Sequence, residues 1–243
     1  LHATCFLLEC LFLVCGLTLL YLTGITDDLI GVRYRQKFVI QILCACFFSI
    51  AELWINDLYG LLGIYAIPNW IGIPFTILTI VFITNAINLI DGIDGLASGL
   101  SSVALLVFGL LFIEKGLWMY SMLAFSTLGV LVPFFYYNVF GNAERARKIF
   151  MGDTGSLTLG YILSFLAIKY SQNNPEVISN TKGTFLIAFS TLIIPAFDVI
   201  RVVMVRLRNG KSPFEPDKNH IHHKFLAMGF TPRKAMIIII LIS

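Results

Sequence analysis

Residues 85–97 read NAINLIDGIDGLA and place two asparagines, two aspartates and two glycines between two apolar stretches. Acidic residues are rare inside apolar membrane segments, because a bare charge costs much free energy there, and they usually have a function. Amide and carboxylate oxygens can hold a hard cation or handle a proton. The plain alternative is a polar turn between two membrane spans. The regular spacing of the polar residues favours a site.

The polar residues of this run, Asn85, Asn88, Asp91 and Asp94, recur at every third position. Each step of three residues turns an α-helix by about 300°, so the first and last of them would point to opposite sides. One straight helix therefore cannot aim all four at one point. We expect Asn88 and Asp91 to share a face near a helix end. The glycines at 92 and 95 weaken the helix, allow close backbone approach and bring Asp94 round.

A second polar stretch, TGITDDLIGVRYRQK at 23–37, contains the adjacent carboxylates of Asp27 and Asp28. The pair could simply cap a helix whose N-terminus follows. The alternative is a phosphate site, in which the acids handle a metal or a proton and the basic residues meet the anion. Three basic residues at alternate positions support this second interpretation: Arg33, Arg35 and Lys37.

The third stretch, KIFMGDTGSLTLGY at 148–161, leads from Asp153 and small residues into an apolar segment. An acidic residue here could be an N-cap. It could also hold Mg²⁺ against a phosphate, because Mg²⁺ takes few protein oxygen ligands and binds through substrate phosphates.

The fourth stretch, at 212–230, carries three histidines near three lysines: His220, His222 and His223. A zinc site is one alternative, but no cysteine lies nearby. A solvated interfacial loop is another. The neighbouring lysines would repel a cation and attract a phosphate, so phosphate binding is favoured. For the acids inside apolar segments, Glu9, Glu52 and Asp198, we expect structural roles, with Arg201 pairing Asp198 at i and i+3.

The composition indicates the environment of these stretches. Of the 243 residues, 58% are hydrophobic and 13% charged, and the mean hydropathy is +0.86. A soluble domain would carry roughly 25% charged residues. The composition therefore predicts an integral, multi-span membrane protein. The net charge of +3 does not suggest nucleic-acid binding, and the five cysteines match no zinc or redox motif.

We predict an all-α fold, a polytopic membrane helix bundle with about eight spans. A helix needs about 20 apolar residues to cross the hydrocarbon. The expected spans lie near 4–22, 38–57, 70–88, 95–113, 118–137, 155–170 and 184–204, with a further one from about 235. Residues 1–243 are expected to form a single transmembrane domain, truncated at both ends, since the sequence starts without methionine and stops within an apolar run. A signal peptide at the start is the less favoured alternative.

Basic residues indicate which connections face the cytoplasm. If the spans alternate, three lie on one side: Lys115, Lys169 and Lys182. Thirteen lie on the other: Arg33, Arg35, Lys37, Arg145, Arg147, Lys148, Arg206, Arg208, Lys211, Lys218, Lys224, Arg233 and Lys234. Cytoplasmic loops are rich in Lys and Arg. The second side, which also carries the acids and histidines, is therefore predicted to be cytoplasmic and to hold the active site.

Four motifs in this order, DDLIGVRYRQK, NAINLIDGIDGLA, FMGDTGSL and SPFEPDKNHIHH, resemble those of the polyprenyl-phosphate N-acetylhexosamine-1-phosphate transferase family (glycosyltransferase family 4). The resemblance covers essentially the whole chain. HIHH after SPFEPD is most similar to the branch that transfers GlcNAc-1-phosphate to undecaprenyl phosphate. The phospho-N-acetylmuramoyl-pentapeptide transferase branch ranks second, and an ion transporter is the non-enzyme alternative.

The resemblance also implies roles for individual residues. Asn88 and Asp153 match positions that hold the metal, Mg²⁺ with Mn²⁺ as the substitute. Substrate binding falls to residues near the pyrophosphate, the uracil and the phosphates: Lys37, Asp94, Phe150, His220, His222 and His223. The acidic pair near the lipid phosphate and a further acid of the motif form the catalytic set: Asp27, Asp28 and Asp91.

The reaction so implied moves HexNAc-1-phosphate from a UDP-N-acetylhexosamine to undecaprenyl phosphate and releases UMP. This would be the first membrane step of cell-envelope polysaccharide synthesis, in the bacterial inner membrane, with the catalytic loops in the cytoplasm. Direct attack by the lipid phosphate is favoured over a covalent aspartyl intermediate. The expected partners are the UDP-sugar, the lipid phosphate and the bilayer, with no nucleic acid, and a homodimer is the expected candidate assembly.

Overall fold

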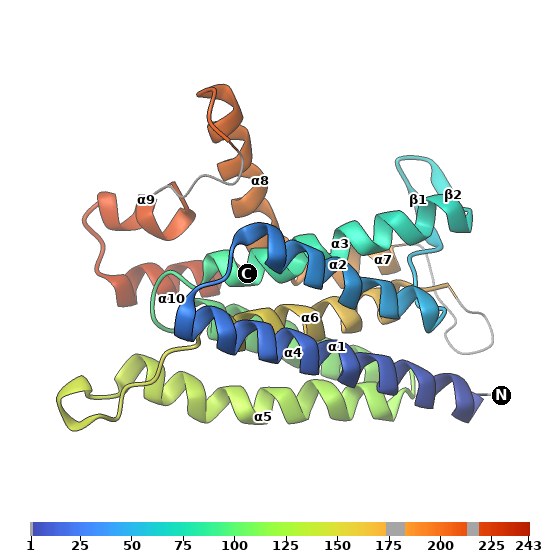
Figure 1. Ribbon diagram of the computed structural model, residues 1–243, viewed down its shortest axis with the longest axis horizontal. Helices are drawn as coiled ribbons and strands as arrows, with labels where there is room; N and C mark the ends of the chain where they lie inside the picture. Colours follow the sequence, from blue (N-terminus) through green and yellow to red (C-terminus); the bar gives the residue numbers. More distant parts are fainter. Residues whose placement is uncertain (1, 174–182, 213–218) are drawn as a thin grey trace.

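The computed structural model describes residues 2–173, 183–212 and 219–243, so Lys182 and Lys218 lie outside the described residues. The described chain is mostly helical (Figure 1). Its elements are α1 (His2–Ile30), α2 (Tyr34–Ile50), β1 (Asp57–Leu61), β2 (Ile64–Ala66), α3 (Asn69–Ile90), α4 (Leu96–Glu114), α5 (Trp118–Phe140), the 3₁₀ turn η1 (Ala143–Arg145), α6 (Gly152–Ser171), α7 (Thr184–Ser190), α8 (Ile193–Arg208), α9 (Ile221–Ala227) and α10 (Pro232–Ile242).

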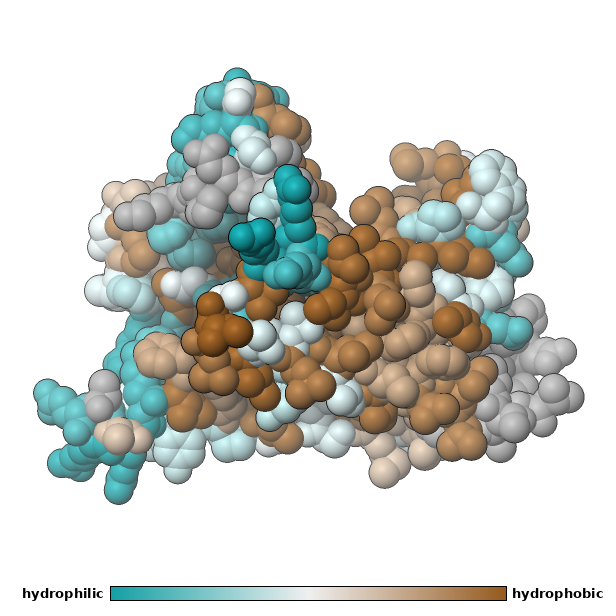
Figure 2. Space-filling view, viewed as in Figure 1, coloured by the Kyte–Doolittle hydropathy of each residue, from teal (hydrophilic) through white to brown (hydrophobic). Residues whose placement is uncertain are grey.

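Within the described residues, four helices are long and apolar enough to cross a membrane: α1 from Leu7, α3, α4 and α5. Helices α7 and α8 would form a fifth span if counted together, but they are bent by 76° at a short break. The space-filling view shows apolar side chains across the middle of the visible face, with polar side chains at the lower left and at the tip of α8 (Figure 2). These features confirm a helical membrane protein; the count of eight spans stays a prediction.

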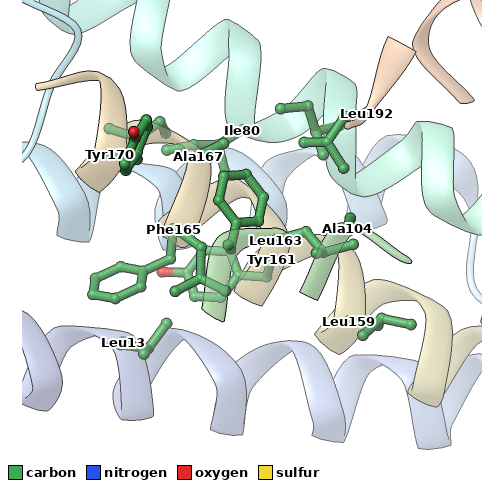
Figure 3. Close-up of a cluster of buried hydrophobic side chains, with 14 of the residues drawn as sticks. Leu13, Ile80, Ala104, Leu159, Tyr161, Leu163, Phe165, Ala167, Tyr170 and Leu192 are labelled. Atoms are coloured by element: carbon green, nitrogen blue, oxygen red, sulfur yellow. The ribbon is translucent and has the colours of Figure 1, made fainter. Parts of the chain in front are cut away.

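Helix α6 occupies the centre of the bundle and packs against α1, α3 and α4. From Ser156 to Ser171 nearly every side chain is buried. Figure 3 shows Tyr161 and Phe165 of α6 between Leu13 of α1 and Ile80 of α3. The sequence predicted a span at 155–170, the short and least secure one of the set. The structure gives the reason, because a helix surrounded by protein needs no lipid-facing surface.

Glycines allow α6 to approach its neighbours closely. A Cβ on Gly24 of α1 would lie 2.3 Å from the Cα of Thr154, and one on Gly160 would lie 2.7 Å from the Cα of Thr84 in α3. Small residues that let backbones approach are typical of membrane helix interfaces. These two contacts fix where the ends of α1 and α3 meet the start of α6.

Three local predictions need correction. The first connection was placed at 23–37, but α1 continues to Ile30. Within these last turns the hydroxyls of Thr23 and Thr26 donate to backbone carbonyls of the same helix. It ends at Gly31, which has a left-handed φ of 76° and donates its N–H to the Asp27 carbonyl.

Second, the fold is not purely helical: β1 and β2 pair as an antiparallel hairpin between α2 and α3. Third, the span predicted at 184–204 is broken in two. Helix α7 ends at Ser190 and α8 starts at Ile193, with Pro195 in its first turn, where the missing N–H costs nothing. Figure 1 shows that α8 leaves the bundle instead of running along it.

A buried ion pair lies towards the end of the bundle that carries the N-terminus. Lys169 of α6 donates to Glu9 of α1 at 2.7 Å, and the hydroxyl of Tyr120 in α5 donates to the same carboxylate at 2.6 Å. Glu9 and Lys169 are 3% and 4% exposed. Glu9 therefore joins α1 to α5 and α6. This is a structural role, as the sequence predicted.

Removing one partner of this pair should strongly destabilise the fold. Glu9→Gln leaves the buried ammonium of Lys169 uncompensated, which costs about 3 kcal/mol or more. The double variant Glu9→Gln with Lys169→Met should recover most of that loss, because neither charge then remains. Thermal unfolding in detergent measures both, with the exposed Glu144→Gln as a control. Equal stability of the single and double variants would contradict the prediction.

Candidate active site

The predicted polar motifs lie at one end of the bundle. The last turn of α1, the start of α2, the end of α3, the start of α6 and α9 are all at the left in Figure 1, while the N-terminus and the β-hairpin are at the right. This confirms that the motifs share one end. Which side of the membrane that end faces stays a prediction.

Asp28 caps the N-terminus of α6. Its carboxylate accepts the backbone N–H of Asp153 at 2.8 Å, and the N–H and hydroxyl of Thr154 at 3.1 and 2.6 Å. The first N–H groups of a helix have no partner within it, and a carboxylate there also meets the positive end of the helix dipole. The sequence predicted that the acidic pair could cap a helix following it; the capped helix is α6 instead, 125 residues on.

Asp27 meets Asp153 through Lys37. The ammonium of Lys37, at the start of α2, pairs with Asp27 and with Asp153, the latter at 2.8 Å. Asp27 also accepts the N–H of Val32 at 2.5 Å. The amide of Asn88 donates to Asp153 and, at 2.8 Å, to the hydroxyl of Ser156. Four of the predicted site residues, from α1, α2, α3 and α6, are therefore in contact.

Asn85 lies apart from this cluster. Its amide donates to Gln41 at 2.6 Å and to the carbonyl of Val81 at 2.7 Å, so it holds α3 against α2. Asp91 follows the last residue of α3, and Asp94 lies in the turn that leads to α4, outside the helix that carries Asn88, as the helix geometry predicted. Burial, together with the charges of Asp94 and Asp153, raises the pKa of Asp91 to about 6.

The two glycines of this turn act differently. A Cβ on Gly92 would lie 2.3 Å from the Nε2 and Cε1 atoms of His222, so glycine lets that ring touch the backbone. Gly95 adopts a left-handed φ of 80° and donates its N–H to the Oδ1 of Asn138 at 2.6 Å. Asn138 in turn donates to the carbonyl of Ile149 at 2.8 Å. This buried amide joins the 91–95 turn to the segment before α6.

Asp94 and Phe150 are brought together through Lys148. Lys148 pairs with Asp94 at 2.6 Å, and its Nζ lies 5.6 Å from the centre of the Phe150 ring. Phe150 is 75% exposed, so its ring is free for an aromatic partner. The role of the two residues at one base stays a prediction.

The three histidines lie around the start of α9. The rings of His220 and His222 are parallel, with centres 5.9 Å apart, and those of His222 and His223 are 4.2 Å apart. Burial, then the neighbouring histidines, lowers the pKa of His222 to about 4, so this ring is neutral at pH 7. Its contact with Gly92 brings the histidines to the 91–95 turn.

The donor set at the α6 N-terminus fits a hard divalent cation. Five carboxylates lie at this end of the bundle, those of Asp27, Asp28, Asp91, Asp94 and Asp153. In the part of the chain that the structure describes, Lys37 and Lys148 form ion pairs with three of them. Among the described residues, no three His, Cys, Asp or Glu side chains are arranged to hold a metal by themselves. Mg²⁺ suits such a site, because it binds through one or two carboxylates and keeps waters or phosphate oxygens as its other ligands.

Three contributing residues were not predicted as site residues: Asn138, Lys148 and Asp198. Lys148 could have been found from its place two residues before Phe150. Asn138 is one amide within an apolar helix, and nothing in its local sequence points to a contact 43 residues away. Asp198 was expected to pair only with Arg201, yet it also accepts from His220 at 2.8 Å.

Comparison with known proteins identifies the family. The model of glycosyl transferase family 4 matches residues 10–171, which include the acidic pair, the 85–97 run and Asp153. The chain belongs to this family. The resemblance inferred from the four motifs is thereby confirmed.

Several curated relatives are similar over nearly the whole chain. It is 32% identical to the undecaprenyl-phosphate alpha-N-acetylglucosaminyl 1-phosphate transferase of Yersinia pestis over 233 residues, which are 95% of this chain and 62% of the relative. It is 33% identical to a probable undecaprenyl-phosphate N-acetylglucosaminyl 1-phosphate transferase of Bacillus subtilis, over 94% of this chain and 61% of the relative. The chain therefore spans about three fifths of the length of these relatives.

The cap on α6 leads to a stability prediction. Asp28→Ala should lower the free energy of unfolding by about 1–2 kcal/mol, since the first N–H groups of α6 lose their acceptor. Asp28→Asn keeps one acceptor oxygen and should cost less. Denaturation in detergent measures the difference. If the alanine and asparagine variants were equally stable, the cap would not be the role of this carboxylate.

The raised pKa of Asp91 leads to a pH prediction. The folded protein binds this proton with a pKa of about 6, against about 3.9 for an unfolded aspartate. The folded state therefore gains stability from this group as the pH falls through 6. In the absence of divalent metal, lowering the pH from 7.5 to 5.5 should raise the melting temperature of the wild type relative to that of Asp91→Asn. Parallel pH curves for the two proteins would overturn this expectation.

Proposed function

We propose that the complete protein transfers GlcNAc-1-phosphate from UDP-GlcNAc to undecaprenyl phosphate and releases UMP. The proposal rests chiefly on the contact of Asp27, Lys37, Asn88 and Asp153 at one end of an apolar bundle. The names of the relatives state the lipid acceptor and the sugar phosphate. No contact among the described residues favours a transporter, whose acids would line a route between the two faces.

We further propose that the polar end faces the cytoplasm of a bacterial inner membrane. The bias of basic residues towards that end supports this orientation. With the bent α7–α8 pair counted as one span, helices α2, α6 and α10 would complete the predicted eight spans, and α6 would be shielded from lipid by its neighbours. In this arrangement the water-soluble UDP-sugar arrives from the cytoplasm, and the lipid presents its phosphate from the bilayer interface. Helix ends at the interface are where the two can meet.

In the proposed reaction an oxygen of the lipid phosphate attacks the β-phosphorus of the UDP-sugar. The bond from that phosphorus to the bridging oxygen breaks, and UMP leaves with the electron pair. Asn88 and Asp153 would hold Mg²⁺, which when bound neutralises charge on the pyrophosphate and on the leaving group. Lys37 places a cation between the two carboxylates and can turn to a phosphate oxygen.

Asp27 fits a positioning role better than that of a general base. Its oxygens already accept from Lys37 and from the Val32 N–H. A phosphate monoester has a second pKa of about 6, so much of the lipid phosphate is a dianion near neutral pH and needs no base. Asp94, Lys148 and Phe150 would receive the uracil, with the exposed Phe150 ring stacking on it.

The test is transfer by the complete protein in nanodiscs with Mg²⁺, undecaprenyl phosphate and separate UDP-sugars, scored by UMP release. UDP-GlcNAc should give turnover and EDTA should abolish it. Turnover only with the UDP-muramoyl-pentapeptide donor would assign the other branch of the family. UMP exchange into the UDP-sugar in the absence of lipid would show a covalent intermediate instead of direct attack.

Within the same assay, Asp153→Asn should reduce kcat by at least about 100-fold, because the proposed metal loses its carboxylate. Expression and melting temperature should change little, since Asn88 and Lys37 keep neighbouring contacts. Asp57→Asn, at the opposite end of the bundle, serves as the matched control. Undiminished Mg²⁺-dependent turnover in the Asp153 variant would remove this residue from the metal site.

A further inference from the structure

Asp198 does more than pair with Arg201 one helical turn along α8. It is 2% exposed, and its carboxylate has three partners. Oδ1 accepts from Arg201 at 2.7 Å and from the backbone N–H of Ile221 at 2.8 Å. Oδ2 lies 2.8 Å from Nδ1 of His220. A single side chain of α8 thus holds both the first histidine and the start of α9.

These contacts fix which nitrogen of His220 carries a proton. Asp198 accepts from a guanidinium and from an amide, so it acts as an ionised acceptor. Nδ1 of His220 must therefore donate to it. A carboxylate on one ring nitrogen sets the tautomer and the ring orientation, and leaves the other nitrogen for a substrate. In His220 that other nitrogen is Nε2.

The orientation of His220 extends to the rest of the site. Its ring lies parallel to that of His222, at an interplanar angle of 5°. His222 in turn rests on the backbone at Gly92, next to Asp91. The carboxylate on α8 is thus connected, through two stacked rings, to the turn after α3. The bend between α7 and α8 turns α8 out of the bundle (Figure 1), and Asp198 on this helix meets the start of α9.

We propose that Asp198 is a positioning residue for the transfer reaction and acts through His220. It keeps the proton on Nδ1 and the Nε2 atom directed to a phosphate group of the substrates. The identity of the reaction rests on the proposed function, and the positioning role of Asp198 rests on its contact with His220. The alternative is that Asp198 only anchors α9. A substitution of Arg201, the other charged partner of Asp198, separates these two roles.

A double-mutant cycle tests this role. Asp198→Asn keeps the size of the side chain but can donate to Nδ1, which reverses the tautomer. We expect kcat for transfer from UDP-GlcNAc to fall about 10- to 100-fold, with a small change in KM, as for other partners that orient a functional histidine. In a His220→Ala background the same substitution should have almost no further effect on kcat, because the imidazole through which Asp198 acts is already absent. Additive losses in the cycle would overturn the proposal.

Arg201→Gln is the matched control. It removes the other charged partner of Asp198 and the contact to the Asn219 carbonyl, but it leaves the carboxylate on His220. Its kcat should stay within about threefold of the wild type, whatever its melting temperature. A loss as large as that of Asp198→Asn would show that Asp198 only anchors α9. Asp198→Glu, which restores a carboxylate, should recover part of the lost kcat.

Failure of the proposed function is detected separately. If the wild type transferred no sugar phosphate, the same cycle would be measured on the affinity for inorganic pyrophosphate by calorimetry, which needs no turnover. Weaker pyrophosphate binding in Asp198→Asn, and no further weakening in the His220→Ala background, would sustain the role of Asp198 in phosphate recognition. Unchanged or additive affinities would reject it.

Discussion

Two carboxylates from different helices repel each other at close range, and a positive group in contact with both offsets that repulsion. At the end of this bundle Asp27 and Asp153 meet through the ammonium of Lys37. The N-terminus of α6, with its unpaired N–H groups, provides the second positive element and takes up Asp28. The rest of the site depends on this balance. Among the described residues, two of the five carboxylates there, those of Asp28 and Asp91, have no ion pair with a lysine. The same arrangement that closes the helix ends therefore also suits a divalent ion.

The helices are built to bring these groups together. Gly24 and Gly160 remove the side chains that would separate α6 from α1 and α3. Asn138 then joins the turn after α3 to the segment before α6. At the other side Asp198 holds the histidines, which reach the same turn at Gly92. The site is therefore a set of short segments, each attached to a rigid helix end by one or two hydrogen bonds.

Much of this could be predicted from the sequence. Asn88, Asp153 and the acidic pair were identified by residue type and spacing, and helix geometry correctly separated Asp94 from Asn88. The remainder depends on contacts between distant segments. The sequence around Asp28 does not show that its partner is α6, and no periodicity marks the break before Ile193. The extension of α1 to Ile30 was missed because its last turns are polar, and the hairpin because its strands are only five and three residues long.

The burial of α6 has a consequence for how the protein is made. Helix α6 should insert poorly into the membrane on its own, because insertion depends on the summed apolarity of a segment. Serines, threonines, glycines and one lysine lower that apolarity in α6. During synthesis α6 emerges after α1, α3, α4 and α5, which are long and apolar enough to span a membrane. These four helices can therefore enter the bilayer first and offer α6 a protein surface instead of lipid. The order of the segments in the gene thus matches the order in which stable insertion can occur.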